Sequence, residues 1–296
     1  MIFLDGVGIG KPDPESNPFF TRKFRFLNDI FGSTPHLGNL HLNTDKAYLF
    51  PVDACMGVEG LPQSGTGQTS IFCGVNASLI TGFHFGPFPH SLLLPVITEQ
   101  NIFADFLRMG KKVTFVNAYP EIFFEYIRSG KKRLSVTSLS CRLSGVRLNT
   151  PNDLRRGRAL SAEITNSRWV RKLNYDLPVI KPETAAKRLL RISAEHHFTL
   201  FEYFLTDHYG HGRIAEIDED ILGMLDRFLF YLLSNFETEK GTLIICSDHG
   251  NLEDISIKMH TLNPALAITM GSNAAELSQR IKSLPDIKPA IINLYK

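Results

Sequence analysis

The chain has 296 residues, of which 43% are hydrophobic and 21% charged, so it is long enough for one large core with a small appendage. No apolar run reaches the length of a membrane span, and Met1 leads directly into an apolar segment that leaves no room for a signal peptide. The four cysteines lack CxxC spacing, which favours reduced thiols over a disulfide or zinc framework. We therefore expect a cytoplasmic globular protein with no membrane partner.

The formal net charge of +2 hides a basic segment. Residues 128–191 carry 16 Lys and Arg against 4 Asp and Glu, whereas the rest of the chain carries 16 against 26. Clustered positive charge concentrates anions, so this segment suggests a region that meets an anionic substrate. A solvated face or a nucleic-acid patch would explain the composition equally well. No nucleic-acid-binding motif supports the latter, and we expect no nucleic-acid partner.

The chain opens with a predicted strand, residues 1–4, followed by Asp5 and the glycine-rich segment 6–10 (GVGIG). Glycines after a strand can hold a dinucleotide phosphate, but the G-x-G-x-x-G spacing is missing and prolines interrupt the helix that should follow. We interpret Asp5 as a metal ligand and the glycines as residues that let the backbone approach the metals closely. Residues 15–60 are predicted to be mostly turns and loops.

Residues 61–74 are predicted to be a loop that opens into a buried helix. Its hydroxyl side chains are Ser64, Thr66 and Thr69. A hydroxyl at a helix N-terminus lies beside N–H groups that favour an anionic oxygen or a bound phosphate, as expected of a nucleophile. The simpler interpretation is a helix cap, because Ser is a preferred N-cap residue.

The middle of the chain is predicted to contain a helix over residues 102–109, a strand over 113–116 and a helix over 154–163. Asn152 or Asp153 is the expected N-cap of the last helix. Its first turns carry three arginines, which are candidate ligands for the anionic part of a substrate: Arg155, Arg156 and Arg158.

Two later runs, residues 198–205 and 242–246, are rich in β-branched and aromatic residues and are predicted to be buried strands. A helix with one apolar face is predicted over residues 214–236, a strand over 265–270 and a helix over 274–284. The run TDHYGH (residues 206–211) after the first strand supplies Asp and His, and the run SDHGN (residues 247–251) follows the second. Both pairs should therefore lie where strands end, which is where open α/β sheets bind ligands.

The candidate metal ligands are carboxylates and imidazoles at these strand ends. Oxygen and imidazole nitrogen are ligands of zinc, and manganese accepts carboxylates with an occasional imidazole. A single Asp-His pair on a loop is more often a cap or a solvated turn, but six such residues are enough for two metal ions sharing one site. The six are Asp5, Asp207, His211, Asp248, His249 and His260.

The ordered motifs DGxG, DxxxH, DHGN and HTxNP resemble the signature of the alkaline phosphatase superfamily, and most closely its branch of cofactor-independent phosphoglycerate mutases and phosphopentomutases. The resemblance implies an α/β fold, a three-layer α/β/α sandwich with a small inserted cap. Residues 1–125 and 190–296 would form a discontinuous metal-binding core, and residues 126–189 a basic cap. This cap is much shorter than the inserted domain of the phosphoglycerate mutases.

The resemblance also implies the roles of the site residues. The mutases carry Ser or Thr followed three residues later by Gly, and Ser64 with Gly67 and Gly74 fits this spacing best, with Thr66 as the alternative nucleophile. Two divalent ions are implied, Mn²⁺ or Zn²⁺ with Mg²⁺ also compatible. One would be held by Asp5, Ser64, Asp248 and His249, and the other by Asp207, His211 and His260.

The activity implied by the resemblance is phosphoryl transfer through phosphorylated Ser64 on a small phosphorylated substrate, giving a phosphatase or a phosphomutase. A related phosphodiesterase or sulfatase-like hydrolase is an alternative, although residues 63–68 lack the C/S-x-P-x-R motif of sulfatases. A third possibility is a metal-binding protein without catalytic activity. Because all six ligands and a hydroxyl are present, we predict an enzyme.

Overall fold

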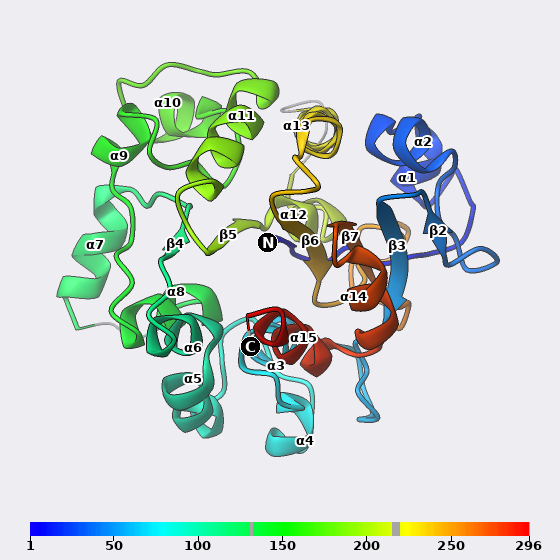
Figure 1. Ribbon diagram of the computed structural model, residues 1–296, viewed down its shortest axis with the longest axis horizontal. Coiled ribbons are helices and arrows are strands. Elements are labelled where there is room, and N and C mark those ends of the chain that lie inside the picture. Colours follow the sequence, from blue (N-terminus) through cyan, green and yellow to red (C-terminus); the bar gives the residue numbers. More distant parts are fainter. Residues whose placement is uncertain (131–132, 215–219, 296) are drawn as a thin grey trace.

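The computed structural model describes residues 1–130, 133–214 and 220–295, and its centre is a seven-stranded sheet in the order β2-β3-β7-β6-β1-β5-β4 (Figure 1). The strands are β1 (Ile2–Leu4), β2 (Leu42–Asn43), β3 (Ala47–Val52), β4 (Val113–Phe115), β5 (Phe198–Tyr203), β6 (Thr242–Ser247) and β7 (Ala265–Gly271). The four strands β4, β5, β1 and β6 run parallel, whereas β7, β3 and β2 continue the sheet in antiparallel pairs.

Helices cover both faces of this sheet. They are α1 (Pro18–Thr21), α2 (Arg25–Phe31), α3 (Ser64–Cys73), α4 (Ala77–Thr81), α5 (Leu94–Gln100), α6 (Ile102–Arg108), α7 (Glu121–Arg128), α8 (Val136–Leu143), α9 (Pro151–Arg155), α10 (Ser167–Leu173), α11 (Pro182–Ser193), α12 (Leu205–Gly210), α13 (Ile221–Asn235), α14 (Ala274–Arg280) and α15 (Ile287–Asn293), with 3₁₀ turns η1 (Ser91–Leu93) and η2 (Leu284–Asp286). No helix among the described residues is long and apolar enough to cross a bilayer.

The strand residues alternate between two hydrophobic cores, because successive side chains in a strand point to opposite faces. In β1, Ile2 and Leu4 belong to one core and Phe3 to the other. The first core lies under α2, α11 and α13, and the second under α3, α6, α8 and α15. This arrangement is the predicted three-layer α/β/α sandwich.

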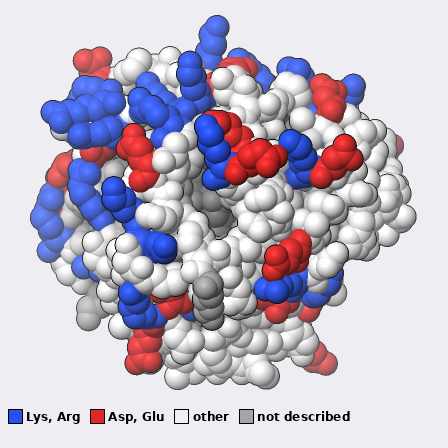
Figure 2. Space-filling view, viewed as in Figure 1, with Lys and Arg blue, Asp and Glu red and all other residues white. Residues whose placement is uncertain are grey.

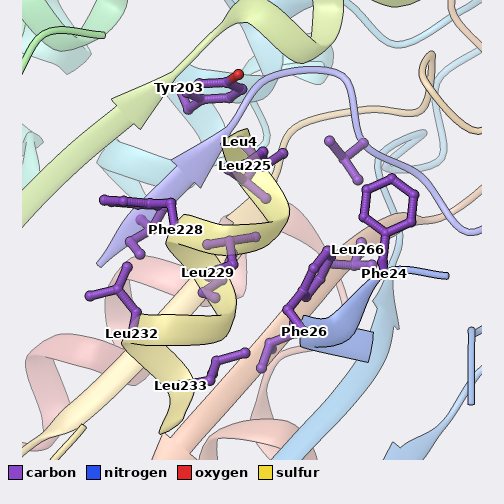
Figure 3. Close-up of a cluster of buried hydrophobic side chains, with 14 of the residues drawn as sticks. Leu4, Phe24, Phe26, Tyr203, Leu225, Phe228, Leu229, Leu232, Leu233 and Leu266 are labelled. Atoms are coloured by element: carbon purple, nitrogen blue, oxygen red, sulfur yellow. The ribbon is translucent and has the colours of Figure 1, made fainter. Parts of the chain in front are cut away.

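Helix α13 forms most of one side of the first core (Figure 3). Its apolar side chains recur at helical spacing and point toward the sheet and toward α2. They are Leu225, Phe228, Leu229, Leu232 and Leu233. The predicted helix over residues 214–236 is thus present as α13, beginning at Ile221 after Asp220 caps it through the N–H of Gly223. Residue Ile217 of that prediction lies outside the described residues.

Most of residues 15–60 lie in turns and loops, as predicted, but the sequence did not indicate the helices and strands among them. These elements are α1, α2, β2 and β3, and β3 is a six-residue strand whose partner is β7 near the other end of the chain. Pro51 lies inside β3, and proline within a run weakens the strand signal in a sequence. The pairing that stabilises β3 is long-range, so local periodicity does not reveal it.

The predicted helix over residues 154–163 is wrong in its bounds. Helix α9 begins earlier, with Thr150 and Asp153 forming a capping box, and it ends at Arg155. Gly157 then takes a positive φ of 66°, which turns the chain out of the helix. Residues 156–163 are therefore turns and loop, although their apolar residues have helical spacing.

The segment 126–189, predicted to be a cap, contributes to several parts of the structure. Helix α8 packs into the second core, and α11, which continues to Ser193, packs against α13. A small separate cluster forms around Trp169 and Leu154. The division of the chain into a core and a cap at these boundaries stays a prediction.

The first core should dominate the stability of the fold. We expect Phe228→Ala to lower the free energy of unfolding by about 3–5 kcal/mol, because the ring is fully buried between α13 and the sheet and its loss leaves a cavity. Urea denaturation in the presence of EDTA measures this. Leu79→Ala, at a side chain that is 70% exposed, serves as the control and should change stability by less than about 0.5 kcal/mol. Equal effects of the two substitutions would contradict this view of the core.

Candidate metal centre

Three parallel strands bring the predicted ligands together at one edge of the sheet. Leu4 is aligned with Tyr203 of β5 and with Ser247 of β6, and each of these residues is the last of its strand. The chain segments that follow the three strands therefore start side by side. Asp5 comes directly after β1, and Asp248 directly after β6.

The first cluster consists of Asp5, Asp248 and His249, all of them buried. The Nε2 atom of His249 lies 3.4 Å from Oδ1 of Asp5 and 3.5 Å from Oδ2 of Asp248. One ligand atom of each residue lies within 4.8 Å of the others, a spacing compatible with a shared cation. The hydroxyl of Ser64 joins this cluster, with its Oγ 3.1 Å from the same Nε2.

The second cluster consists of Asp207, His211 and His260. Asp207 and His211 are four residues apart at α12, so they lie on one face of the helical turn. The Nε2 of His211 is 3.3 Å from Oδ1 of Asp207, and that of His260 is 3.4 Å from the same oxygen. The two clusters adjoin, because the rings of His249 and His260 stack with their centroids 3.7 Å apart.

Backbone carbonyls orient two of the histidine rings. Nδ1 of His211 lies 2.8 Å from the carbonyl oxygen of Lys258, and Nδ1 of His260 lies 2.6 Å from that of Pro62. A carbonyl oxygen only accepts, so Nδ1 carries a proton in both rings and Nε2 is the nitrogen directed at the cluster, where it offers a lone pair to a cation when the imidazole is neutral. This is the arrangement found in histidines that bind metals through Nε2.

The carboxylates also fit a cation. Oδ1 of Asp5 and Oδ2 of Asp248 are buried and accept no hydrogen bond from the residues that the structure describes. Buried oxygen atoms without donors are costly unless a cation compensates them. The donor set of carboxylate oxygens and imidazole nitrogens suits divalent zinc or manganese.

Without a cation, protons take over part of its role. Burial, together with the charge of Asp5, raises the pKa of Asp248 well above its usual value. Burial lowers the pKa of His249, but the charges of Asp248, Asp5 and Asp207 outweigh that effect and raise it to about 10. His249 therefore holds a proton at neutral pH that a metal ion would have to displace.

The hydrogen bonds of the three candidate hydroxyl groups distinguish them as nucleophiles. Ser64, at the first position of α3, places its hydroxyl on the first cluster. Thr66 donates to the carbonyl of Gln63 at 3.2 Å and Thr69 to that of Gly65 at 2.6 Å, so both hydroxyls bond to the backbone of the helix and its start. The geometry supports Ser64 as the hydroxyl that a substrate would meet.

Two glycines allow the elements to approach this closely. Gly6 has a φ of 67°, and a Cβ there would lie 3.0 Å from Oδ1 of Asp207. A Cβ at Gly67 would lie 2.9 Å from the Cβ of Asp248, so α3 can pack on the first cluster only with glycine at that position. Gly67 is one of the glycines in the spacing that indicated Ser64.

The arginines predicted to bind substrate have other contacts in the structure. Arg155 is exposed and its Nη2 lies 3.5 Å from the carbonyl of Asp176. Arg158 forms an ion pair at 3.1 Å with the buried Asp153, and Arg156 is exposed at the end of α9. Within the described part of the chain, none of the three arginines contacts either cluster, and their role in substrate binding stays a prediction.

The sequence interpretation missed two residues beside the clusters. Asn251 donates from Nδ2 to Oδ1 of Asp207 at 2.9 Å and so holds that carboxylate in place. Glu202 is buried on β5, and burial together with the charge of Asp5 raises its pKa to about 8. A charged residue in the otherwise uncharged strand FTLFEY was the available signal for Glu202.

The fold is similar to that of alkaline phosphatases, and the donor set forms a candidate metal centre. Solved structures with this fold include the PH0037 protein of Pyrococcus horikoshii, with a TM-score of 0.56, 14% identity, and coverage of 99% of this chain and 94% of that one. A cold-active alkaline phosphatase from a psychrophilic Shewanella species gives a TM-score of 0.52, 9% identity, and coverage of 100% and 99%. At these identities the likeness concerns the fold.

Residues 166–296 match the family model of the Metalloenzyme superfamily. A segment of 130 residues is 27% identical to the 2,3-bisphosphoglycerate-independent phosphoglycerate mutase of Desulforudis audaxviator, covering 40% of this chain and 25% of the mutase. The resemblance to the alkaline phosphatase superfamily, predicted from four short motifs, is confirmed. The match spans only a quarter of the length of that mutase.

Metal binding should depend on pH, because the cation must displace the proton held by His249. The pKa of His249 is raised to about 10, so its imidazole holds a proton at neutral pH in the metal-free protein and releases it on binding. We expect the association constant for Mn²⁺ or Zn²⁺ to rise between pH 6 and pH 8, by up to about tenfold per pH unit for each proton released. Calorimetric titrations in buffers of different ionisation enthalpy count these protons. An association constant that does not vary with pH would contradict this account of the centre.

Proposed function

We propose that the protein is a phosphoryl-transfer enzyme that depends on two divalent metal ions and acts on a small phosphorylated substrate through the hydroxyl of Ser64. The observation that carries the proposal is the position of this hydroxyl, 3.1 Å from Nε2 of His249 and at the first turn of the ten-residue helix α3. Two adjoining clusters of Asp and His surround it. The matches to a phosphoglycerate mutase and to the Metalloenzyme superfamily support the same class of reaction.

Asp5, Asp248, His249 and Ser64 would hold one metal ion, and Asp207, His211 and His260 the other. When bound, such ions stabilise the charge that develops on the attacking and leaving oxygens of a phosphoryl transfer. Mn²⁺ or Zn²⁺ fits the donors, and Mg²⁺ is compatible with the carboxylates.

The residues of the chain supply position and electrostatics. Ser64 would form a bond from Oγ to phosphorus as it loses its hydroxyl proton, while the bond from phosphorus to the ester oxygen breaks and that oxygen takes up a proton and leaves as an alcohol, which gives a phosphorylated serine. The positive end of the dipole of α3 lies at Ser64 and favours the negative charge of the phosphoryl group. Water as the next acceptor makes the enzyme a phosphatase, and a second hydroxyl of the substrate makes it a phosphomutase.

The basic segment offers a reason for an anionic substrate. Figure 2 shows Lys and Arg side chains gathered where Figure 1 draws α9, α10 and α11. Clustered cations raise the local concentration of anions and accelerate their encounter with a site. We propose that Arg156, an exposed residue of this surface, helps to attract the substrate.

Ser64→Ala tests the nucleophile directly. We expect it to lower the metal-dependent release of p-nitrophenol from p-nitrophenyl phosphate by at least about 100-fold, while Mn²⁺ binding falls less because the other donors remain. Thr66→Ser is the matched control, since it keeps a hydroxyl that can bond to Gln63, and it should retain most activity. Turnover that survives in Ser64→Ala would move the nucleophile elsewhere. No turnover of any phosphate monoester by a metal-loaded wild type, with sugar phosphates tested for isomerisation as well, would contradict the proposed function.

Arg156→Ala tests the basic surface. We expect an increase in KM at low ionic strength with kcat nearly unchanged, because a surface charge steers the substrate without touching the reacting atoms. The difference from the wild type should shrink at 0.5 M salt, where screening over about 4 Å removes long-range attraction. Steady-state kinetics at two salt concentrations measures this, with Arg280→Ala, at an exposed ion pair on α14, as the control. An unchanged KM at low salt would remove Arg156 from the proposal.

A further inference from the structure

Glu253 is a buried carboxylate, 1% exposed, two residues beyond the DHGN motif. Its Oε2 accepts hydrogen bonds from the backbone N–H groups of Gly8 and Asn251, each at 2.8 Å. Its Oε1 accepts from the hydroxyl of Thr261 and, at 3.1 Å, from Nδ2 of Asn263. All four partners donate, so the side chain acts as an acceptor at both oxygens, which a carboxylate does and an amide does not.

The four bonds reach three of the chain segments that carry candidate ligands, those of Asp5, of Asp248 and His249, and of His260. Gly8 lies three residues after Asp5, and Thr261 directly follows His260. Asn251 lies two residues after His249, and its own side chain donates to Asp207. Glu253 thus connects segments that are up to 245 residues apart in the chain, and two of its bonds, from Thr261 and Asn263, end near His260.

The glycines near the start of the chain make room for this carboxylate. A Cβ on Gly8 would lie 2.6 Å from the Cδ of Glu253, and one on Gly10 would lie 2.7 Å from its Cγ. A Cβ on Gly250 would lie 2.2 Å from Oε1. Three glycines therefore surround one side chain, which explains the GVGIG segment better than close approach of the backbone to the metals does.

We propose that Glu253 is the positioning residue of the metal centre: it holds the segments after β1 and β6 and the segment carrying His260 in the register that lets both clusters bind cations. This inference rests on the proposed function, because it takes the two clusters to be metal sites. Groups that orient metal ligands without touching the metal typically change its affinity by about 10–100-fold when they are substituted. A carboxylate buried with four donors is costly to place for packing alone.

Glu253→Gln is the test, since it keeps the shape of the side chain but turns one acceptor oxygen into a donor. We expect it to fold, to bind Mn²⁺ and Zn²⁺ about 10–100-fold more weakly than the wild type in competition with a chromophoric chelator, and to gain less thermal stability from added metal. The control is Asp226→Asn, another buried carboxylate, which accepts from the backbone N–H of Phe26. It should lower the melting temperature in EDTA and leave the metal affinity at the wild-type value.

The outcomes separate the two proposals. If the wild type binds metal and Glu253→Gln binds it with the same affinity, the positioning role alone is overturned, whatever the melting temperature in EDTA. A wild type that binds no divalent ion would overturn the proposed function and this inference together. If Glu253→Gln does not fold, Asn263→Ala removes only one of the four bonds. It should weaken metal binding in the same direction, and wild-type affinity in that variant would overturn the inference.

Discussion

The main constraint on the site is the electrostatic repulsion among three buried aspartates at the edge of the sheet, which the rest of the site must compensate. They are Asp5, Asp207 and Asp248. Removing carboxylates from water and placing them together is unfavourable unless positive charge compensates them. In the metal-free protein, His249 supplies part of that charge by holding a proton, since its pKa is raised to about 10, and burial beside Asp5 raises the pKa of Asp248. Both responses indicate a place that is built for cations.

The surroundings of the clusters are arranged so that the aspartates cannot move apart. Parallel register fixes Asp5 and Asp248 at adjacent strand ends, and the Nδ2 group of Asn251 holds Asp207. Backbone carbonyls fix the rings of His211 and His260, and Glu253 connects the segments that follow the strands. Rigid orientation of ligands by such outer groups strengthens metal binding, because little ordering remains to be done when the ion arrives.

The sequence predicted those parts of the fold and the site that depend on local patterns. The apolar runs that became β5 and β6 are continuous and β-branched, and the polar residues that end them are the ones that the structure brings together. The hydroxyl of Ser64 could be singled out because its glycine spacing reflects a real packing constraint at Gly67. The positions of Asp5 and Asp248 directly after their strands are therefore readable without any knowledge of the tertiary contacts, whereas Asp207 lies on α12 and His260 in the segment before β7.

What the sequence did not predict depends on contacts between distant segments. Strand β3 exists because β7 pairs with it, and Pro51 weakens its local signal. The four partners of Glu253 lie at both ends of the chain, so nothing in its immediate neighbours indicates its role. Helix α9 ends before a turn at Gly157, although apolar residues continue to recur at helical spacing beyond it. Buried loop residues can produce the same apolar spacing as a helix, so the spacing did not reveal where α9 ends.

The candidate nucleophile and the candidate metal ligands come from different layers of the fold, and this separation has a mechanical consequence. The ligands follow strands and loops at the sheet edge, whereas Ser64 begins α3, whose ten residues are all buried in the second layer. Ile71 and Phe72 bury the far end of this helix in the core, and Gly67 allows its first turns to pack closely on Asp248. A hydroxyl held by a buried helix loses little further conformational freedom when it attacks. The entropic cost of positioning it is therefore incurred during folding and not during the reaction.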